Sequence, residues 1–105
     1  MEKMIYDGPY EGIYMEQNFE KFLKKEIEIE KISEGRAKVP GHRYHGNCVN
    51  YYITGKKQHA LLECYFRWPC SVTVIARSNK EGIKAIEDVT AKGEKEFKGL
   101  NWINS

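Results

Sequence analysis

The residues best suited to chemistry lie together in the middle of the chain, where histidine and cysteine are concentrated. All three histidines and all three cysteines of the 105-residue sequence fall between residues 42 and 70. In the run His-Arg-Tyr-His-Gly-Asn-Cys over residues 42–48, the residues His42, His45 and Cys48 recur at every third position. Imidazole nitrogens and thiolate sulfurs are the ligands that zinc prefers. These three residues are therefore the candidate metal ligands.

A complete zinc site is not evident, because a structural site is usually built from two short pairs of ligands. The remaining residues, His59, Cys64 and Cys70, follow at long intervals on or beside expected strands. Cys64 shares one face of its expected strand with Leu62 and Phe66, which is typical of a small buried side chain. We predict no cofactor and no disulfide framework, and keep a small Cys/His metal-binding or thiol-dependent protein as an alternative.

Catalytic machinery is also not evident in this region. Between residues 36 and 77 the only carboxylate is Glu63, so a mechanism with two carboxylates cannot be built there. A thiolate beside a histidine is conceivable, but no nucleophile elbow or oxyanion loop marks any cysteine. We predict that the protein is not an enzyme and that Glu63 pairs with a basic residue across a sheet.

Charge is strongly segregated along the sequence. Residues 1–35 have a net charge of −4, residues 36–77 have seven Lys/Arg against one Glu, a net of +6, and residues 78–105 are neutral. The basic segment also contains several aromatic residues. Segregation of this kind indicates an anionic partner. The predicted partner-binding residues are Arg36, Lys38, Arg43, Tyr44, Tyr51, Lys56, Lys57, Tyr65, Arg67, Trp68 and Arg77.

The nature of that partner is left open by the sequence. Strand alternation places Tyr65 and Arg67 on one face of their strand, and Tyr51 and Arg77 are expected to join that face. An acidic protein surface would match it, which makes a regulatory protein, an inhibitor or an adaptor the first hypothesis. Rings flanked by cations also bind single-stranded RNA or DNA, which is the second hypothesis.

The elements that must position these residues follow from the hydrophobic spacing. A helix is predicted near 12–26, with Glu16 and Glu20 on its solvent side, followed by a short strand at 27–30 or a continuation of the helix. Residues 36–47 are expected to be irregular or a hairpin arm. Three strands are predicted at 48–54, 60–67 and 71–77, and a helix near 79–92.

Local signals refine the C-terminal part of this prediction. Ser78 has the spacing of a capping box with Glu81, and Gly93 is the expected C-terminal stop of the second helix. The apolar tail that contains Phe97, Leu100, Trp102 and Ile103 is expected to dock as a helical turn or an edge strand, or to contact a partner.

The predicted fold is a single α+β domain over residues 1–105. It has an N-terminal helix, a three- to four-stranded antiparallel meander sheet and a helix after the last strand, with both helices on one face of the sheet. No segment reaches the roughly 18–20 apolar residues needed to cross a bilayer, and the start does not resemble a secretory signal. We expect a cytoplasmic protein without membrane partners, and self-association of oppositely charged regions as a further possibility.

Overall fold

The part of the chain that the structure describes forms two helices and five strands. The computed structural model describes residues 11–54, 60–67 and 71–104. The elements in chain order are α1 (Glu11–Glu26), β1 (Ile29–Lys38), β2 (His45–Ile53), β3 (Ala60–Arg67), β4 (Ser71–Ser78), α2 (Lys80–Glu96) and β5 (Leu100–Asn104). The predicted α+β class is confirmed, as are both helices and the three consecutive strands β2, β3 and β4.

The sheet has one strand more than the largest number predicted. Its order is β1-β2-β3-β4-β5, with antiparallel pairs up to β4 and a parallel pair between β4 and β5. The connection between the two parallel strands is α2, as a parallel crossover requires. Of the alternatives for the apolar tail, the edge strand is the one that forms.

The edge strand β1 is longer than the strand that the sequence predicted there. The sequence predicted a short strand at 27–30 or a continuation of the helix, but α1 ends at Glu26 and β1 runs from Ile29 to Lys38. Residues 36–47, predicted to be irregular or a hairpin arm, contain the end of β1, the turn and the start of β2. Nearly all side chains of β1 are exposed, so the strand lacks the hydrophobic alternation that would reveal it. Its pairing with β2 shifts between Lys31 and Ser33, which is a bulge at Ile32.

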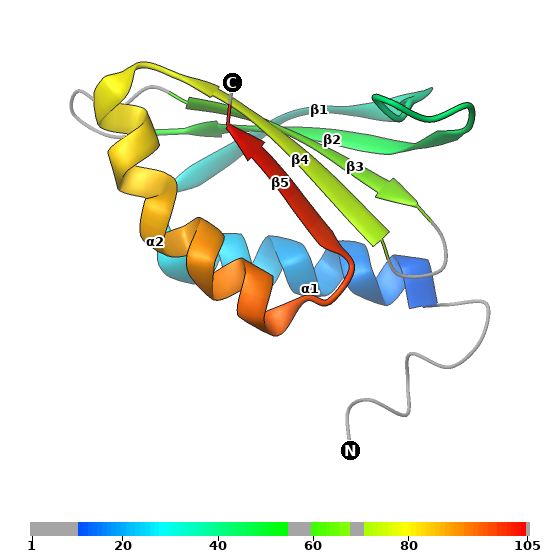
Figure 1. The fold of residues 1–105 in the computed structure, drawn as a ribbon, viewed down its shortest axis with the longest axis horizontal. Coiled ribbons are helices and arrows are strands. Elements are labelled where there is room, and N and C mark those ends of the chain that lie inside the picture. The colour runs from blue at the N-terminus through cyan, green and yellow to red at the C-terminus, as the bar shows by residue number, and fades with distance from the viewer. Residues whose placement is uncertain (1–10, 55–59, 68–70, 105) are drawn as a thin grey trace.

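Both helices cover the same face of the sheet, as predicted (Figure 1). The side chains of α1 that face the sheet include Phe19 and Leu23, and those of α2 include Ile86 and Val89; all four are at most 3% exposed. They meet the alternate residues of the central strands. The resulting core includes Val49, Tyr51, Ile53, Leu62, Cys64, Phe66, Val72, Val74, Ala76 and Trp102.

The ends of α2 differ from the prediction by a few residues. Asn79, and not Ser78, is the N-cap, and its side-chain oxygen accepts a hydrogen bond from the amide of Gly82 at 2.7 Å. Gly93 does not end the helix, which continues to Glu96. Gly93 lies where α2 passes closest to Phe22 and Leu100, so its lack of a side chain allows close packing.

Among the described residues, no helix is both long enough and apolar enough to cross a bilayer.

Candidate functional site

The face of the sheet opposite the helices is covered by no described helix (Figure 1). Because neighbours across the ladder share a face, the register defines its rows: Cys48–Tyr65–Thr73–Asn101, Asn50–Glu63–Ile75–Ile103, and Tyr52–Leu61–Arg77. Arg67 and Gly46 belong to the next row at the hairpin end. We call this set of residues the open face.

Three predicted binding residues lie on the open face, namely Tyr65, Arg67 and Arg77. The predicted pairing of Glu63 with a basic residue is also found, because Arg77 Nε lies 3.4 Å from Glu63 Oε1. Burial, with smaller contributions from Cys48 and Glu63, raises the pKa of Tyr65 to about 12. Tyr65 is therefore a neutral phenol at physiological pH, and Arg77 has an acidic neighbour on its own sheet face.

Arg67 forms the most specific contact on the open face. Its guanidinium carbon lies 3.0 Å from the centroid of the Tyr44 ring, which is a cation–π arrangement. The Tyr44 ring also stacks with that of His42, with centroids 4.9 Å apart, and its hydroxyl lies 2.8 Å from His42 Nδ1. Gly46 lies in β2, two residues after Tyr44, and a Cβ there would collide with the carbonyl oxygen of Phe66. Glycine is therefore required for the strands to approach beneath this stack.

Tyr51 was wrongly assigned to the open face. It is 1% exposed, pairs with Leu62, and points towards α1. The cause is strand alternation: Tyr51 has the same parity as Val49 and Ile53, so it enters the core with them. Tyr52 is the tyrosine of β2 that lies on the open face.

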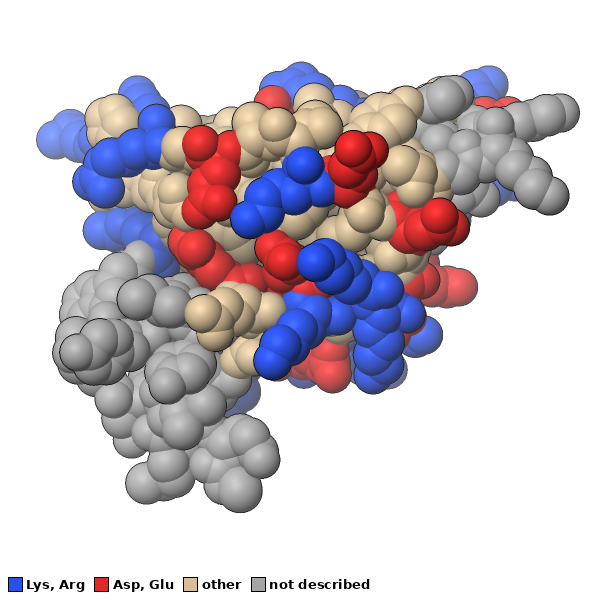
Figure 2. Space-filling model, turned by 180° about the vertical axis from the view of Figure 1, so that it is seen from behind, with Lys and Arg blue, Asp and Glu red and all other residues tan. Residues whose placement is uncertain are grey.

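The remaining predicted cations are distributed around the β1–β2 hairpin. Arg36 pairs with Asn47, whose side chain reaches α1, so Arg36 and Lys38 lie on the opposite side of the edge strand from the open face. Arg43 is exposed in the turn. Figure 2, which views the molecule from behind, shows basic side chains gathered at this end. Lys56, Lys57 and Trp68 lie outside the described residues.

The candidate metal ligands are not assembled. Within residues 11–54, 60–67 and 71–104, no three His, Cys, Asp or Glu side chains are placed to hold a metal ion together. Cys48 and Cys64 are buried free thiols, and desolvation raises the pKa of each. A thiol with a raised pKa forms little thiolate and reacts slowly. His59 and Cys70 lie outside the described residues.

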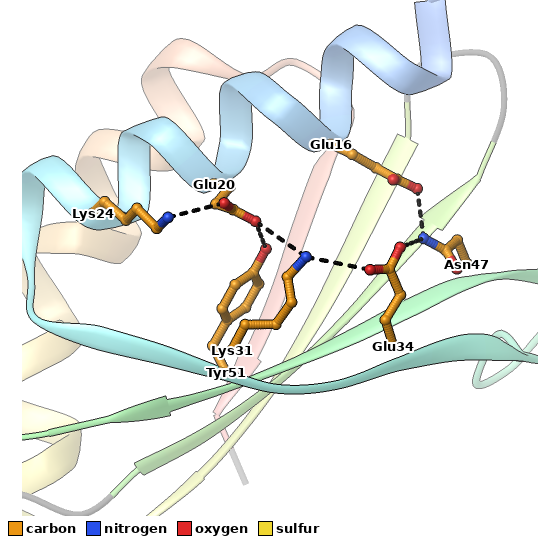
Figure 3. Close-up of polar contacts among 7 residues, drawn as sticks. All are labelled: Glu16, Glu20, Lys24, Lys31, Glu34, Asn47 and Tyr51. Atoms are coloured by element: carbon orange, nitrogen blue, oxygen red, sulfur yellow. Dashed lines mark hydrogen bonds and ion pairs between the residues drawn. The ribbon is translucent and has the colours of Figure 1, made fainter.

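A second polar cluster, which the sequence did not predict, joins α1 to β1 and β2 (Figure 3). The Asn47 side-chain nitrogen donates to Glu16 Oε1 at 3.0 Å and to Glu34 Oε2 at 2.9 Å. Tyr51 donates its hydroxyl proton to Glu20 Oε1 at 2.8 Å. Lys31 lies between two carboxylates, 3.2 Å from Glu34 and 3.8 Å from Glu20.

The carboxylates of this cluster have opposed pKa shifts. Burial raises the pKa of Glu16, with a smaller contribution from nearby Glu34. Burial also acts to raise that of Glu20, but the hydrogen bonds from Tyr51 and Lys24 outweigh it, so the pKa of Glu20 is lowered. Hydrogen bonds from Asn47 and Lys31 lower the pKa of Glu34. The shallow groove beside these residues has a volume of about 310 Å³.

This cluster helps to hold α1 on the sheet, because Glu16 and Glu20 of the helix are each bound by a side chain of β2. The sequence predicted Glu16 and Glu20 on the solvent side of the helix, where glutamates four residues apart usually lie. They instead flank its buried face and are half-buried. Figure 2 shows acidic and basic side chains adjoining one another on the face seen from behind.

Comparison with known proteins gives no relative: no family model, curated protein or solved structure matches the chain.

Proposed function

We propose that the protein is a non-enzymatic binding protein that holds an acidic protein partner on the open face and the adjoining β1–β2 hairpin. The observation that carries the proposal is the combination, on a sheet face that no described helix covers, of aliphatic and aromatic side chains with cations at its hairpin end. Protein interfaces also combine apolar side chains with polar ones, and Arg and Tyr are enriched in them.

The apolar part of the open face consists of aliphatic and aromatic side chains on β2 to β5, which lie beside Asn50 and the Glu63–Arg77 ion pair. Ile75 pairs with Ile103, which is 44% exposed, and Leu61 lies in the next row. Tyr52 and Tyr65 flank them on the same face. Aliphatic side chains gain free energy by losing contact with water, at roughly 25 cal/mol per Å² of apolar surface. A folded partner with its own apolar patch would provide that burial.

The cations at the hairpin end would meet acidic side chains of the partner. The guanidinium of Arg67 lies over the Tyr44 ring, and its five N–H donors suit the binding of a carboxylate. Arg43 is exposed in the adjacent turn. Because the ring holds Arg67 in place, less side-chain entropy is lost when a carboxylate binds.

Single-stranded nucleic acid is the less favoured partner. Bases need free ring faces on which to stack, and the Tyr44 ring already contacts both Arg67 and His42. The centre of the open face is aliphatic as well as aromatic. We also propose a cytoplasmic location, because a reducing compartment preserves free thiols such as Cys48 and Cys64.

The experiment compares the wild type with the double variant Arg43→Glu/Arg67→Glu in affinity capture. A matched control, Lys84→Glu/Lys95→Glu, makes the same charge change at exposed positions of α2, on the other side of the molecule. The proposal expects a protein that is retained by the wild type and by the α2 variant and is lost by the Arg43/Arg67 variant. Subsequent titration of that protein in solution should show the same order of affinities.

Two results would contradict the proposal. One is the absence of any captured protein that distinguishes the two double variants. The other is tight, salt-sensitive binding of a single-stranded oligonucleotide that the Arg43/Arg67 variant loses and the α2 variant keeps, because it would replace the protein partner by a nucleic acid.

A further inference from the structure

The two edges of the sheet differ in how they are protected from pairing with another strand. The β1 edge is interrupted by the bulge at Ile32 and carries charged side chains along its length, including Glu30, Lys31, Glu34, Arg36 and Lys38. Bulges and charges are the usual means by which an edge strand avoids pairing with another chain. The β5 edge, Leu-Asn-Trp-Ile-Asn over residues 100–104, has no bulge in its register, no charged residue and no proline.

The ladder between β4 and β5 determines which backbone groups of β5 point away from the sheet. The amide of Val72 donates to the carbonyl of Gly99 at 3.0 Å. In a parallel ladder alternate residues of a strand bond to the same neighbour, so residues 99, 101 and 103 bond towards β4. The outward groups are therefore the carbonyl of Leu100 and the amides and carbonyls of Trp102 and Asn104. The amide of Leu100 is already donated to Phe97, at 3.1 Å.

Apart from the Asn104 carbonyl, whose counterpart, the Leu100 amide, is bonded to Phe97, these outward groups are symmetric about Trp102. We propose that two copies of the chain associate through antiparallel pairing of their β5 strands, with the two-fold axis between the two Trp102 residues. Each Trp102 then exchanges both backbone hydrogen bonds with its counterpart, and each Asn104 amide meets the Leu100 carbonyl of the other copy. The contact is isologous and closes as a dimer with a continuous ten-stranded sheet.

The side chains of β5 favour a second copy as the occupant of this edge. In this register Asn101 lies opposite Ile103 of the other copy, so no charge is opposed to a like charge. Ile103 is one of two large hydrophobic side chains exposed among the described residues; the other is Ile32, in the bulge of the protected edge. Dimerisation would bring the Ile103 side chains together and join the two open faces into one. The inference does not depend on what the open face binds.

Sedimentation and amide exchange test the proposal on the wild-type chain. Between about 5 µM and about 500 µM, sedimentation should change from mainly monomer towards dimer, as expected for a dissociation constant in the micromolar range. Over the same range, exchange of the Trp102 amide should slow severalfold. The Ile103 amide, which bonds to β4 in the monomer, is the internal control and should not change.

Charge complementation provides the decisive variant test. The variants Asn101→Lys/Ile103→Lys and Asn101→Glu/Ile103→Glu should each remain monomeric, because the antiparallel register opposes like charges. An equimolar mixture of the two should form a heterodimer. Both positions are exposed on the open face, so the monomers should stay folded, which circular dichroism checks.

A wild type that stays monomeric up to about 500 µM, with Trp102 exchange independent of concentration, would overturn the proposal. A dimer that persists in both charged variants would overturn it as well, because the contact would then lie elsewhere. Since these measurements contain no other protein, their failure is distinct from failure of the proposed partner binding.

Discussion

The two faces of the sheet are built from the same strands but perform different tasks. In β3, Leu62, Cys64 and Phe66 are at most 4% exposed beneath the helices, whereas the residues between them are half-buried on the open face. The covered face carries most of the apolar burial on which stability depends. The open face combines tyrosines, arginines and aliphatic side chains that no described helix covers. Alternation within a single strand therefore separates stability from recognition, and substitutions at adjacent positions should separate them too.

The largest expected difference is between adjacent leucines of β3. Leu62→Ala removes a fully buried side chain and should lower the free energy of unfolding by about 2–5 kcal/mol, through lost burial and the cavity that remains. Leu61→Ala, on the open face, should lower it by about 1 kcal/mol or less. Urea denaturation monitored by tryptophan fluorescence measures both. Equal losses would contradict the division between the faces.

A second difference concerns glycines in neighbouring strands. Gly46→Ala should destabilise the fold by about 1–3 kcal/mol, because the new methyl group collides with the carbonyl of Phe66 and the strands must move apart. It should also disturb the Arg67–Tyr44 contact, and hence partner binding. Gly35→Ala is the control: a Cβ there meets nothing within 4 Å, so the denaturation midpoint should change little.

A third difference concerns the two candidate capping residues at the start of α2, Asn79 and Ser78. Asn79→Ala removes the oxygen that accepts the Gly82 amide and should lower stability by about 1 kcal/mol. Ser78→Ala should be neutral or slightly stabilising, because Ser78 Oγ is buried and has no hydrogen-bond partner among the described residues. If the serine variant proved the more harmful, Ser78 would be the cap, as its capping-box spacing suggests.

The smallest expected effects concern the carboxylates that bind α1 to the sheet. The lowered pKa of Glu20 means that its ionised form stabilises the fold, and that this stabilisation is lost as pH falls through the folded-state pKa. Glu20→Gln should therefore lower stability at about pH 7, by less than about 1 kcal/mol for a partly exposed group. Once the pH falls below the folded-state pKa of Glu20, the difference from the wild type should disappear.

Glu16→Gln should behave in the opposite way. The pKa of Glu16 is raised, so ionisation at neutral pH weakens the fold, and protonation on acidification relieves this. The amide of glutamine keeps an acceptor for Asn47 without the charge. Stability at about pH 7 should be unchanged or slightly higher, with no gain in acid. Matching losses in both variants would refute the opposed pKa shifts.

The sequence was sufficient where hydrophobic periodicity was strong. α1, α2 and the strands β2 to β4 each have buried residues at helical or alternating spacing, and the predicted meander is present. β1 could not be predicted at its full length, because it is an edge strand whose side chains are nearly all exposed. The parallel position of β5 also leaves no local signal, since it depends on where α2 returns the chain.

The candidate site was predicted only in part, for equally physical reasons. Strand parity correctly placed Tyr65, Arg67 and Arg77 on one face, and the same parity, applied to Val49 and Ile53, would have placed Tyr51 in the core. The Arg67–Tyr44 stack depends on a hairpin whose register is fixed by β1, so it could not be derived from spacing. The polar cluster at α1 depends on long-range contacts for the same reason.

The bridging amide of Asn47 makes the attachment of α1 sensitive to one slow chemical change. Its two N–H groups each serve a different glutamate, one on α1 and one on β1. Deamidation would replace both donors with a carboxylate and leave three mutually repelling acids around the former bridge. A molecule aged in this way would keep its sequence in every other respect, yet its first helix would be held less firmly at neutral pH. Deamidation of Asn47 would thus limit the time over which the protein keeps its native structure.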